Sequence, residues 1–363
     1  MNRVSAFLSL VALVVLSACG GETEVTGPPS GLLKRVLVSN TFTTVQGVAT
    51  GRLELVSAEQ DLLYFSSNFT DPGITRMRLT ADRSKTVVYN SSSRNFQLVD
   101  NATEALAGIV PSTGALSAPS DDFVVLPDND TIFAAVRNAP VSGQPSGAVV
   151  ALDISDATIS TTIPVPHVRR LALSPNGGKL LAFPDDMNSM WVIDTAAKTA
   201  TRVDGLDRPT WAAFTSDNSR AYVLNCGPEC GGTSASVRVL DLTTNTLGAS
   251  VAVSAATIAL LDGSNLYVAG TSSGGGKLDV INTSNFTVSR SGTPIGDGFH
   301  HLMTLGMNSK LFVGARTCSG GCLSVVDTSN QNTIVSTPAG DVTGMQPIPD
   351  RPVVYVIEGA ELV

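Results

Sequence analysis

The stretch LALSPNGGKLLAFPDDMNSMWVIDTAAKTATRV, residues 171–203, decides the fold of this chain. It holds a tight Pro175-Asn176-Gly177 turn between two apolar segments, and a third apolar segment that closes on Asp194. Pro and Gly supply the backbone angles of a reversal, and an Asp at a strand end hydrogen-bonds the turn that follows it. The stretch therefore predicts consecutive antiparallel strands of about six residues.

The Asp-closed strand recurs along the chain. Its copies end in Asp or Asn and lie 41 to 53 residues apart, at residues 96–100, 149–153, 190–194, 237–241, 278–282 and 323–327. This is the period of a four-stranded propeller blade. One such unit cannot bury both faces of its sheet, so neighbouring units must stack and share a core. We therefore predict an all-β fold, a β-propeller of four-stranded antiparallel blades.

The number of blades follows from the segments expected to be innermost. Seven candidates precede the repeats, at residues 74–79, 123–126, 168–173, 211–214, 257–261, 302–305 and 342–348. They predict seven blades. Residues 35–65 supply strands without an obvious inner one, so we expect the ring to close by pairing both chain ends in one blade. An eighth, partial blade and a truncated chain are the alternatives.

Residues 171–203 also carry a resemblance to a known repeat. The stretch resembles the YVTN-type, surface-layer β-propeller repeat, with Ser174-Pro175-Asn176-Gly177 and MWVIDT at the matching positions. The likeness covers residues 33–363 and is strongest between 167 and 327, although residues 261–263 and 306–308 depart from the turn motif. It implies a propeller fold, and a shared fold says little about function.

The N-terminus predicts an exported lipoprotein. Residues 1–18 read as a signal peptide, with Arg3 before an apolar run and small residues before Cys19. Leu-Ser-Ala-Cys resembles the bacterial lipobox, which implies lipidation of Cys19, and Gly20 after it implies sorting to the outer membrane. A plain secretory signal and an uncleaved helix are the alternatives, but the run is short for a span of about 20 residues. We expect a flexible tether over 19–31 and one propeller domain over 32–363.

Composition narrows the partners. Charged residues make up 15% of the chain and the net charge is −8, with no Lys/Arg run longer than Arg169-Arg170. These values argue against nucleic acid as a partner. We expect a monomer in the bacterial envelope that contacts the membrane through its lipid.

Four further cysteines form two C-x3-C pairs. Cys226 and Cys230 follow one second strand, and Cys318 and Cys322 follow another. An exported compartment is oxidising, so we predict two local disulfides. A zinc site built from four thiolates is the alternative, and it would need the two loops to meet.

Five polar residues fall at the start of expected inner strands, where a propeller channel opens. They are His167, Arg169, Arg208, His300 and His301. They could form a ring that binds a ligand, or they could be ordinary solvated loop residues. Neighbouring residues of a strand point to opposite faces, so His300 and His301 should not bind the same ion.

Two functions follow from these patterns. The first is a non-enzymatic binding or scaffold module for an envelope protein, a peptide or a polysaccharide. The second is a channel-mouth hydrolase of the lactonase type, which would need a histidine, Asp297 and an arginine to converge. No G-x-S-x-G, H-E-x-x-H, Walker or EF-hand pattern is present in the sequence, and we expect no metal or other cofactor. The repeated Asp residues are interpreted as turn residues and not as catalytic groups.

Overall fold

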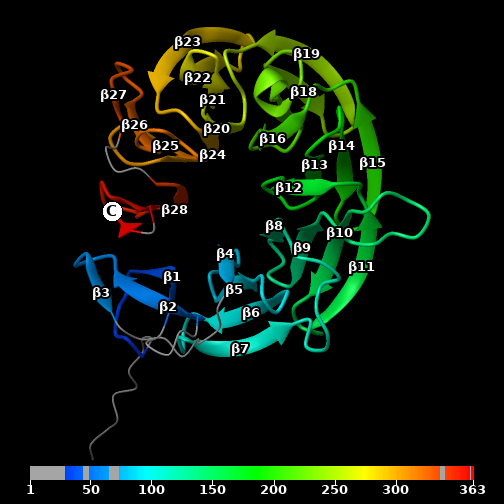
Figure 1. Cartoon of the computed structure of the whole chain (residues 1–363), viewed down its shortest axis with the longest axis vertical. Coiled ribbons are helices and arrows are strands. Elements are labelled where there is room, and N and C mark those ends of the chain that lie inside the picture. The colour runs from blue at the N-terminus through cyan, green and yellow to red at the C-terminus, as the bar shows by residue number, and fades with distance from the viewer. Residues whose placement is uncertain (1–28, 44–48, 65–72, 336–339, 360) are drawn as a thin grey trace, which may run out of the picture.

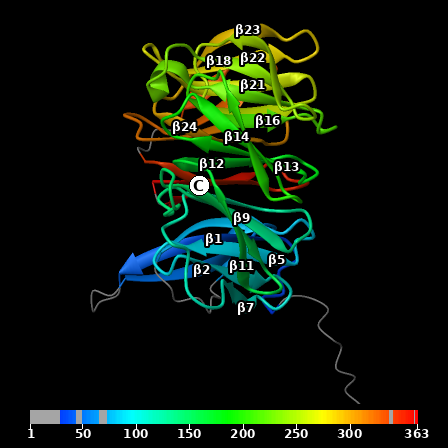
Figure 2. The ribbon, with the colours of Figure 1, turned by 90° about the vertical axis from the view of Figure 1, so that its right-hand side faces the viewer.

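The computed structural model describes residues 29–43, 49–64, 73–335, 340–359 and 361–363, and within them it is built of antiparallel sheets around a central axis (Figure 1). Seen from its edge, the ring shows the sheets standing side by side (Figure 2). The predicted β-propeller of four-stranded antiparallel blades is confirmed. The described part holds eight blades, so the expected number of seven is wrong.

The blades follow the order of the chain. Blade 1 contains β1 (Arg35–Thr43), β2 (Ala49–Ser57) and β3 (Leu62–Tyr64). Blade 2 contains β4 (Ile74–Leu79), β5 (Lys85–Asn90), β6 (Asn95–Asp100) and β7 (Ala105–Val110). Blade 3 contains β8 (Asp122–Val125), β9 (Thr131–Val136), β10 (Ala148–Asp153) and β11 (Thr158–Pro164). Blade 4 contains β12 (Val168–Leu173), β13 (Lys179–Pro184), β14 (Ser189–Asp194) and β15 (Thr199–Asp204).

The second half of the ring repeats the pattern. Blade 5 contains β16 (Pro209–Phe214), β17 (Arg220–Asn225), the 3-10 helix η1 (Gly227–Cys230), β18 (Ser236–Asp241) and β19 (Thr246–Ala252). Blade 6 contains β20 (Ile258–Asp262), β21 (Asn265–Ser272), β22 (Gly275–Asn282) and β23 (Thr287–Ile295). Blade 7 contains β24 (Phe299–Leu305), β25 (Lys310–Arg316), β26 (Leu323–Asp327) and β27 (Thr333–Val335). Blade 8 contains β28 (Val342–Pro347), β29 (Val354–Glu358) and β30 (Glu361–Leu362).

Alternation along each strand places side chains in the cores on both sides of a blade. In β13, Leu180 and Ala182 pack towards blade 3, whereas Leu181 and Phe183 pack towards blade 5. This is the two-residue period of a strand buried on both faces. One cluster of buried apolar residues lies between each pair of neighbouring blades, including blades 8 and 1. The blades therefore depend on their neighbours for burial.

The turns confirm the structural role of the repeated Asp residues. Asp194 accepts a hydrogen bond from the Ala197 amide at 2.9 Å, and Asp241 accepts one from the Thr244 amide at 2.9 Å. These amide bonds stabilise the ionised carboxylate and lower the pKa of Asp241. Gly177 adopts φ 75° in the predicted turn, where a Cβ would lie 2.5 Å from the ring of Pro127. Each blade repeat is thus closed by local hydrogen bonds.

The ring closes in a way that corrects the expectation of one blade shared by both chain ends. Residues 35–43 form an inner strand, because β1 lies beside β4, and the two ends build separate three-stranded blades. Blades 1 and 8 meet through Val56, Ile348 and Tyr355. Arg351 of blade 8 forms two 2.8 Å hydrogen bonds to Asp61 of blade 1 and lowers the pKa of Asp61 to about 2. Among the described residues, closure therefore rests on sheet-to-sheet packing and an ion pair, and no strand of blade 1 pairs with a strand of blade 8.

The expected signal peptide and Cys19 lie outside the described residues, as does most of the expected tether. Within its last residues, the Ser30 amide and hydroxyl donate to the Glu104 carboxylate at 2.9 Å and 2.6 Å. Among the described residues, no helix has the length and apolar character to cross a membrane.

Candidate functional site

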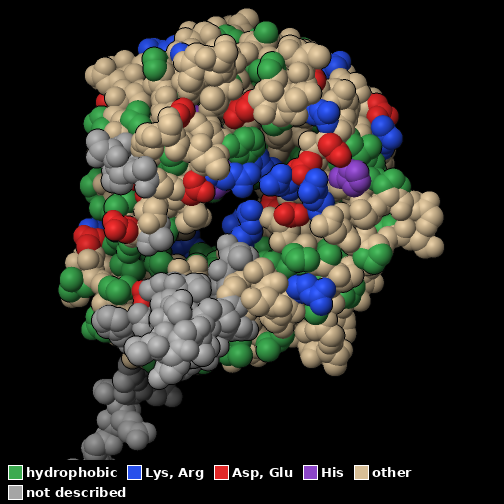
Figure 3. Space-filling view, in the orientation of Figure 1, with side chains coloured by type: hydrophobic (Ala, Val, Ile, Leu, Met, Phe, Trp, Pro, Cys, Tyr) green, Lys and Arg blue, Asp and Glu red, His purple; other side chains and the backbone are tan. Residues whose placement is uncertain are grey.

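The inner strands surround a channel along the ring axis. Each of the seven segments expected to be innermost is the first strand of a blade in the structure. The antiparallel pairing puts the start of each inner strand beside the end of the second strand, as in Phe299 opposite Arg316. We call the face where these ends gather the channel mouth. Figure 3 shows Lys and Arg side chains crowded beside the central opening, with acidic side chains next to them.

One group of charges at the mouth is held by Asp122. Its side chain is only 7% exposed, and its carboxylate lies 3.4 Å from Arg76 Nη1 and 3.6 Å from Arg78 Nη2. It also accepts hydrogen bonds from the amides of Phe123 at 3.0 Å and of Leu171, in the next blade, at 3.1 Å. Asp122 thus joins blades 2, 3 and 4 and offsets one of the two positive charges of Arg76 and Arg78.

A second group is held by Asp185. Its carboxylate lies 3.1 Å from Arg137 Nη2 and 3.1 Å from Arg169 Nη1. Arg169 therefore lies at the mouth, as the sequence predicted, but its guanidinium already forms an ion pair with Asp185. Each of these four arginines thus has a carboxylate partner, and the two carboxylates offset two of their four positive charges.

Arg170 and Arg316 differ from the other arginines of the mouth. Their guanidinium carbons lie 4.9 Å and 5.0 Å from the centre of the same Phe299 ring, although the two residues come from blades 4 and 7. Within the described ranges, no carboxylate oxygen lies within 4.0 Å of either guanidinium. Arg170 Nη1 donates one hydrogen bond of 3.2 Å to the Thr257 carbonyl.

The pKa values of Arg170 and Arg316 indicate that nearby negative charge does not balance their positive charges. Burial and the nearby Arg316 lower the pKa of Arg170 to about 10. Burial, Arg169 and Arg76 lower the pKa of Arg316. Both groups stay protonated at neutral pH, yet like charges and partial dehydration disfavour their charged form. An anion placed between them would relieve this cost.

His301 lies beside the same pair. Burial and the charges of Arg316 and Arg170 lower the pKa of His301 to about 4, so its ring is neutral at neutral pH. Its Nε2 atom is buried and has no hydrogen-bond partner among the residues that the structure describes. The ring also hydrogen-bonds the Val342 backbone, which acts to raise the pKa and is therefore an acceptor for the other ring nitrogen. Nε2 is then the unprotonated nitrogen of the neutral ring, so His301 borders the pair without donating a hydrogen bond to an anion.

Glu229 borders the site from the loop between Cys226 and Cys230. Its carboxylate accepts a 2.7 Å hydrogen bond from the Thr271 amide of the next blade. Burial raises the pKa of Glu229 to about 7, and Arg170 acts in the opposite direction. Glu229 is therefore a carboxyl group that changes charge near neutral pH, within electrostatic range of Arg170.

Both predicted disulfides are confirmed. Cys226 pairs with Cys230 and Cys318 pairs with Cys322, each with Cα atoms 5.7 Å apart. The alternative zinc site would need all four as free thiolates. In the described ranges, no group of three or more His, Cys, Asp or Glu residues has metal-binding geometry.

Three other residues predicted at the mouth have separate roles. His167 Nδ1 lies 2.9 Å from the exposed Asp186 carboxylate. His300 is 1% exposed, and its Nε2 lies 2.9 Å from the Gly296 carbonyl, so it is part of the core of blade 7. Burial lowers the pKa of His300 to about 4. Arg208 has a positive φ of 54° and no ion pair within the described residues. The five predicted residues therefore do not form one ring.

The hydrolase constellation is not assembled either. Asp297 caps the Cys318–Cys322 loop, where it accepts hydrogen bonds from the amide and hydroxyl of Ser319. His300 is engaged in the core, and His167 belongs to a different blade from Asp297. His167, His300 and Asp297 are each occupied by structural contacts, and His301 lies beside Arg170 and Arg316.

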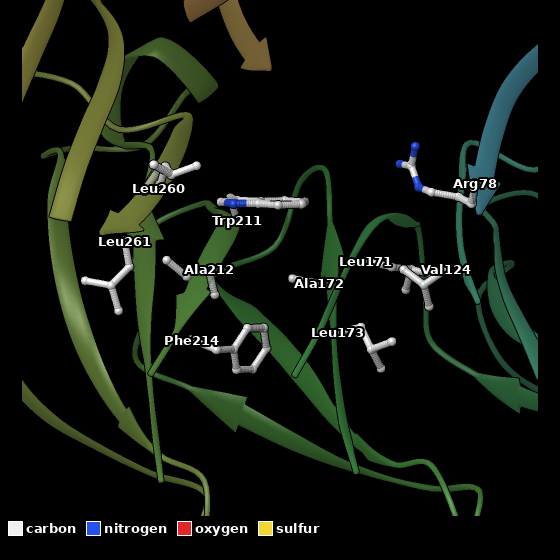
Figure 4. Close-up of a pocket in the computed structure, with 12 residues that line it drawn as sticks. Arg78, Val124, Leu171, Ala172, Leu173, Trp211, Ala212, Phe214, Leu260 and Leu261 are labelled. Atoms are coloured by element: carbon white, nitrogen blue, oxygen red, sulfur yellow. The ribbon is translucent and has the colours of Figure 1, made fainter. Parts of the chain in front are cut away.

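The inner strands also line a hollow of about 320 Å³ that is open to solvent and bordered mainly by apolar side chains. It is lined by side chains from the inner strands of blades 2 to 6, among them Leu173, Trp211, Phe214, Leu260 and Leu261. Figure 4 shows Trp211 projecting across the space opposite Arg78, whose guanidinium turns away from the apolar side chains.

The sequence contained a signal for this site that spacing alone did not reveal. Arg76, Arg170 and Trp211 lie near the start of inner strands. Large or charged side chains at these positions indicate residues that face the channel axis. Arg316 ends a second strand and could not be assigned to the channel without its pairing with Phe299.

Comparisons with known proteins support the fold. No family and no curated protein matches this chain. Among solved structures, hydrazine synthase from Kuenenia stuttgartiensis aligns with a TM-score of 0.61 and 16% identity, over 80% of this chain and 95% of that chain. The dihydro-heme d1 dehydrogenase NirN in complex with DHE aligns with a TM-score of 0.63 and 12% identity, over 93% of this chain and 76% of that chain.

A third similar structure is a functionally unknown protein from Desulfotomaculum acetoxidans. It aligns with a TM-score of 0.54 and 18% identity, over 79% of this chain and 96% of that chain. At these identities the likeness shows the β-propeller fold alone.

Proposed function

We propose that this protein is a binding module whose channel mouth takes a ligand with an oxyanion, such as a carboxylate or a phosphate. The observation that carries the proposal is the pair Arg170 and Arg316, which share the Phe299 ring and lack a carboxylate within 4.0 Å among the described residues. Planar guanidinium groups suit bidentate binding of such anions.

The binding function is better supported than the hydrolase alternative. A hydrolase of the expected type needs a nucleophile or activated water between a base and an orienting group. His167, His300 and Asp297 instead each make local structural contacts. An anion between two arginines requires no such convergence.

We also propose that the module is anchored in the cell envelope by lipid on Cys19, at the outer membrane. The support is the Leu-Ser-Ala-Cys sequence after an apolar run, together with two disulfides that suit an oxidising compartment. An envelope protein, peptide or polysaccharide partner would need to present a carboxylate or phosphate to the mouth. Changing Cys19→Ser should move the protein from the membrane fraction to the soluble fraction. Unchanged membrane association would contradict the anchor.

The binding proposal can be tested with sulfate and inorganic phosphate by titration calorimetry. We expect Arg170→Gln and Arg316→Gln each to weaken binding by about tenfold to a hundredfold, because a hydrogen bond to a charged group contributes about 1.5–3 kcal/mol. Arg290→Gln is the matched control. This substitution removes the same charge, and Arg290 is exposed on the outer strand β23. Equal affinity in the three variants, or no binding by the original protein, would contradict the proposal.

A further inference from the structure

We infer that the channel binds an aliphatic chain that ends in an oxyanion, with its head between Arg170 and Arg316 and its chain in the apolar cavity. This inference rests on the proposed function, because the head group uses the same two arginines. It adds the chemical class of the ligand, which the arginines alone do not determine.

The first support is the lining of the cavity. Arg78 is its only charged side chain among the described residues, and the rest of the lining is hydrophobic. In Figure 4, Leu173, Phe214 and Leu261 lie towards one end of the space and the Arg78 guanidinium towards the other. The site is therefore polar at one end only. A ligand that matches it needs one charged end and one apolar end.

The second support is the continuity of the two parts. Arg78 borders the cavity, and its guanidinium lies 3.6 Å from Asp122. Asp122 in turn accepts a 3.1 Å hydrogen bond from the amide of Leu171, which also borders the cavity and directly follows Arg170 in β12. The apolar cavity and the guanidinium pair thus lie along one channel, and a single elongated molecule can reach both.

The third support is the size of the space. A cavity of about 320 Å³ lies at the lower end of the range of small-molecule sites. A flexible chain of about eight to ten carbon atoms is of a size that such a hollow can take. The aliphatic lining from Leu173, Leu260 and Leu261 suits a flexible chain, and Trp211 supplies a flat wall.

The test is a chain-length series measured by titration calorimetry below the concentration at which the probes aggregate. Acetate, hexanoate, octanoate, decanoate and dodecanoate provide the series, and decyl phosphate compares the two head groups. We expect the affinity to rise about fourfold per methylene, as the burial of a CH₂ implies, and to level off near decanoate. Decanol, which lacks the charge, should bind at least tenfold more weakly than decanoate.

Two variants separate the cavity from the head site. Leu173→Gln makes one end of the cavity polar at a half-buried position, and Trp211→Ala removes its wall. Each should abolish most of the gain from chain length while leaving sulfate affinity within twofold. Ile159→Gln is the matched control, because Ile159 is 41% exposed on the outer strand β11. It should bind the whole series as the original protein does.

The outcomes distinguish the two proposals. If sulfate and acetate bind but longer chains gain nothing, the chain inference is wrong and the anion site stands. If the gain persists in Leu173→Gln and Trp211→Ala, the chain lies elsewhere and the inference is wrong. If no anion binds to the original protein, both the proposed function and this inference fail.

Discussion

The arginines of the channel mouth fall into two groups that differ in what neutralises them. Arg76 and Arg78 lie against the buried Asp122, which also ties three blades together. Arg170 and Arg316 lie against an aromatic ring, and no carboxylate among the described residues comes within 4.0 Å of them. Breaking an ion pair with a buried partner lowers the free energy of unfolding. Positive charges that lack a carboxylate partner also destabilise the folded state, and they attract an anionic ligand. The same residue type is therefore structural in one group and functional in the other.

The largest expected effect concerns the compensated group. Asp122→Asn keeps the shape of the side chain but leaves Arg76 and Arg78 facing each other without a counter-charge. We expect the free energy of unfolding to fall by about 1–3 kcal/mol, because an NH₂ group would replace one of the buried carboxylate oxygens that accept the Phe123 and Leu171 amides, whereas the two arginines are nearly half exposed. Urea unfolding followed by circular dichroism measures this change. Asp204→Asn, which breaks the exposed Arg202 pair, should cost at most about 1 kcal/mol.

The distinction between the two groups of arginines would be contradicted if Asp122→Asn and Asp204→Asn lowered the free energy of unfolding equally. It would also be contradicted if the double variant Arg170→Gln/Arg316→Gln destabilised the fold as much as Asp122→Asn. We expect that double variant to keep or raise the free energy of unfolding, because it removes two like charges that burial disfavours.

A smaller effect on the free energy of unfolding is expected at Asp185, whose single carboxylate pairs with two arginines. Asp185 contacts both Arg137 and Arg169 at 3.1 Å, so Arg169→Gln leaves the carboxylate with one partner. The free energy of unfolding should fall by less than about 1 kcal/mol, since both arginine side chains are partly exposed. Thermal unfolding by differential scanning calorimetry is the measurement. A loss as large as that of Asp122→Asn would show that Arg169 has a structural role that its contacts do not indicate.

The smallest expected effect concerns Glu229 and pH. Burial raises the pKa of Glu229 to about 7, from an ordinary value of 4.5, so the folded state favours the neutral carboxyl. The contribution of Glu229 to the free energy of unfolding is fully present below pH 4.5, and it is lost as the pH rises through 7. The charged form also repels an anion near Arg170. Sulfate affinity should therefore fall severalfold between pH 6 and pH 8.

Glu229→Gln is the variant that isolates this group. It should remove the fall in sulfate affinity between pH 6 and pH 8 and leave the fold unchanged, because the amide oxygen can still accept the Thr271 amide. An unchanged pH dependence in this variant would assign the effect to another group. Sulfate is a suitable probe because its own charge is constant over this range.

The features of the fold that depend on local patterns could be predicted from the sequence. Alternating apolar residues identified the strands, and the Asp-Thr and Pro-Asn-Gly signals identified the turns. The two C-x3-C pairs indicated their own bridges, because each lies within one loop. The eighth blade was predicted only as an alternative, because residues 35–43 lack the repeat signature and become an inner strand only through their position beside β4.

The candidate site could be predicted less well. Arg169 and His301 were named correctly as residues near the mouth, but neither their partners nor the pair Arg170 and Arg316 followed from spacing. A guanidinium reaches several ångströms from its strand, so its neighbours belong to other blades. Only their positions around the ring show which carboxylate compensates which arginine.

The sequence by itself determined a stack of small antiparallel sheets with polar turns, because strand and turn propensities act over a few residues. The tertiary structure decided that eight sheets close the ring and that two arginines from blades 4 and 7 meet over Phe299. The physical reason is the distance over which each interaction acts. Hydrogen bonds and alternation are local along the chain, whereas burial and charge compensation depend on groups that are far apart in sequence and close in space.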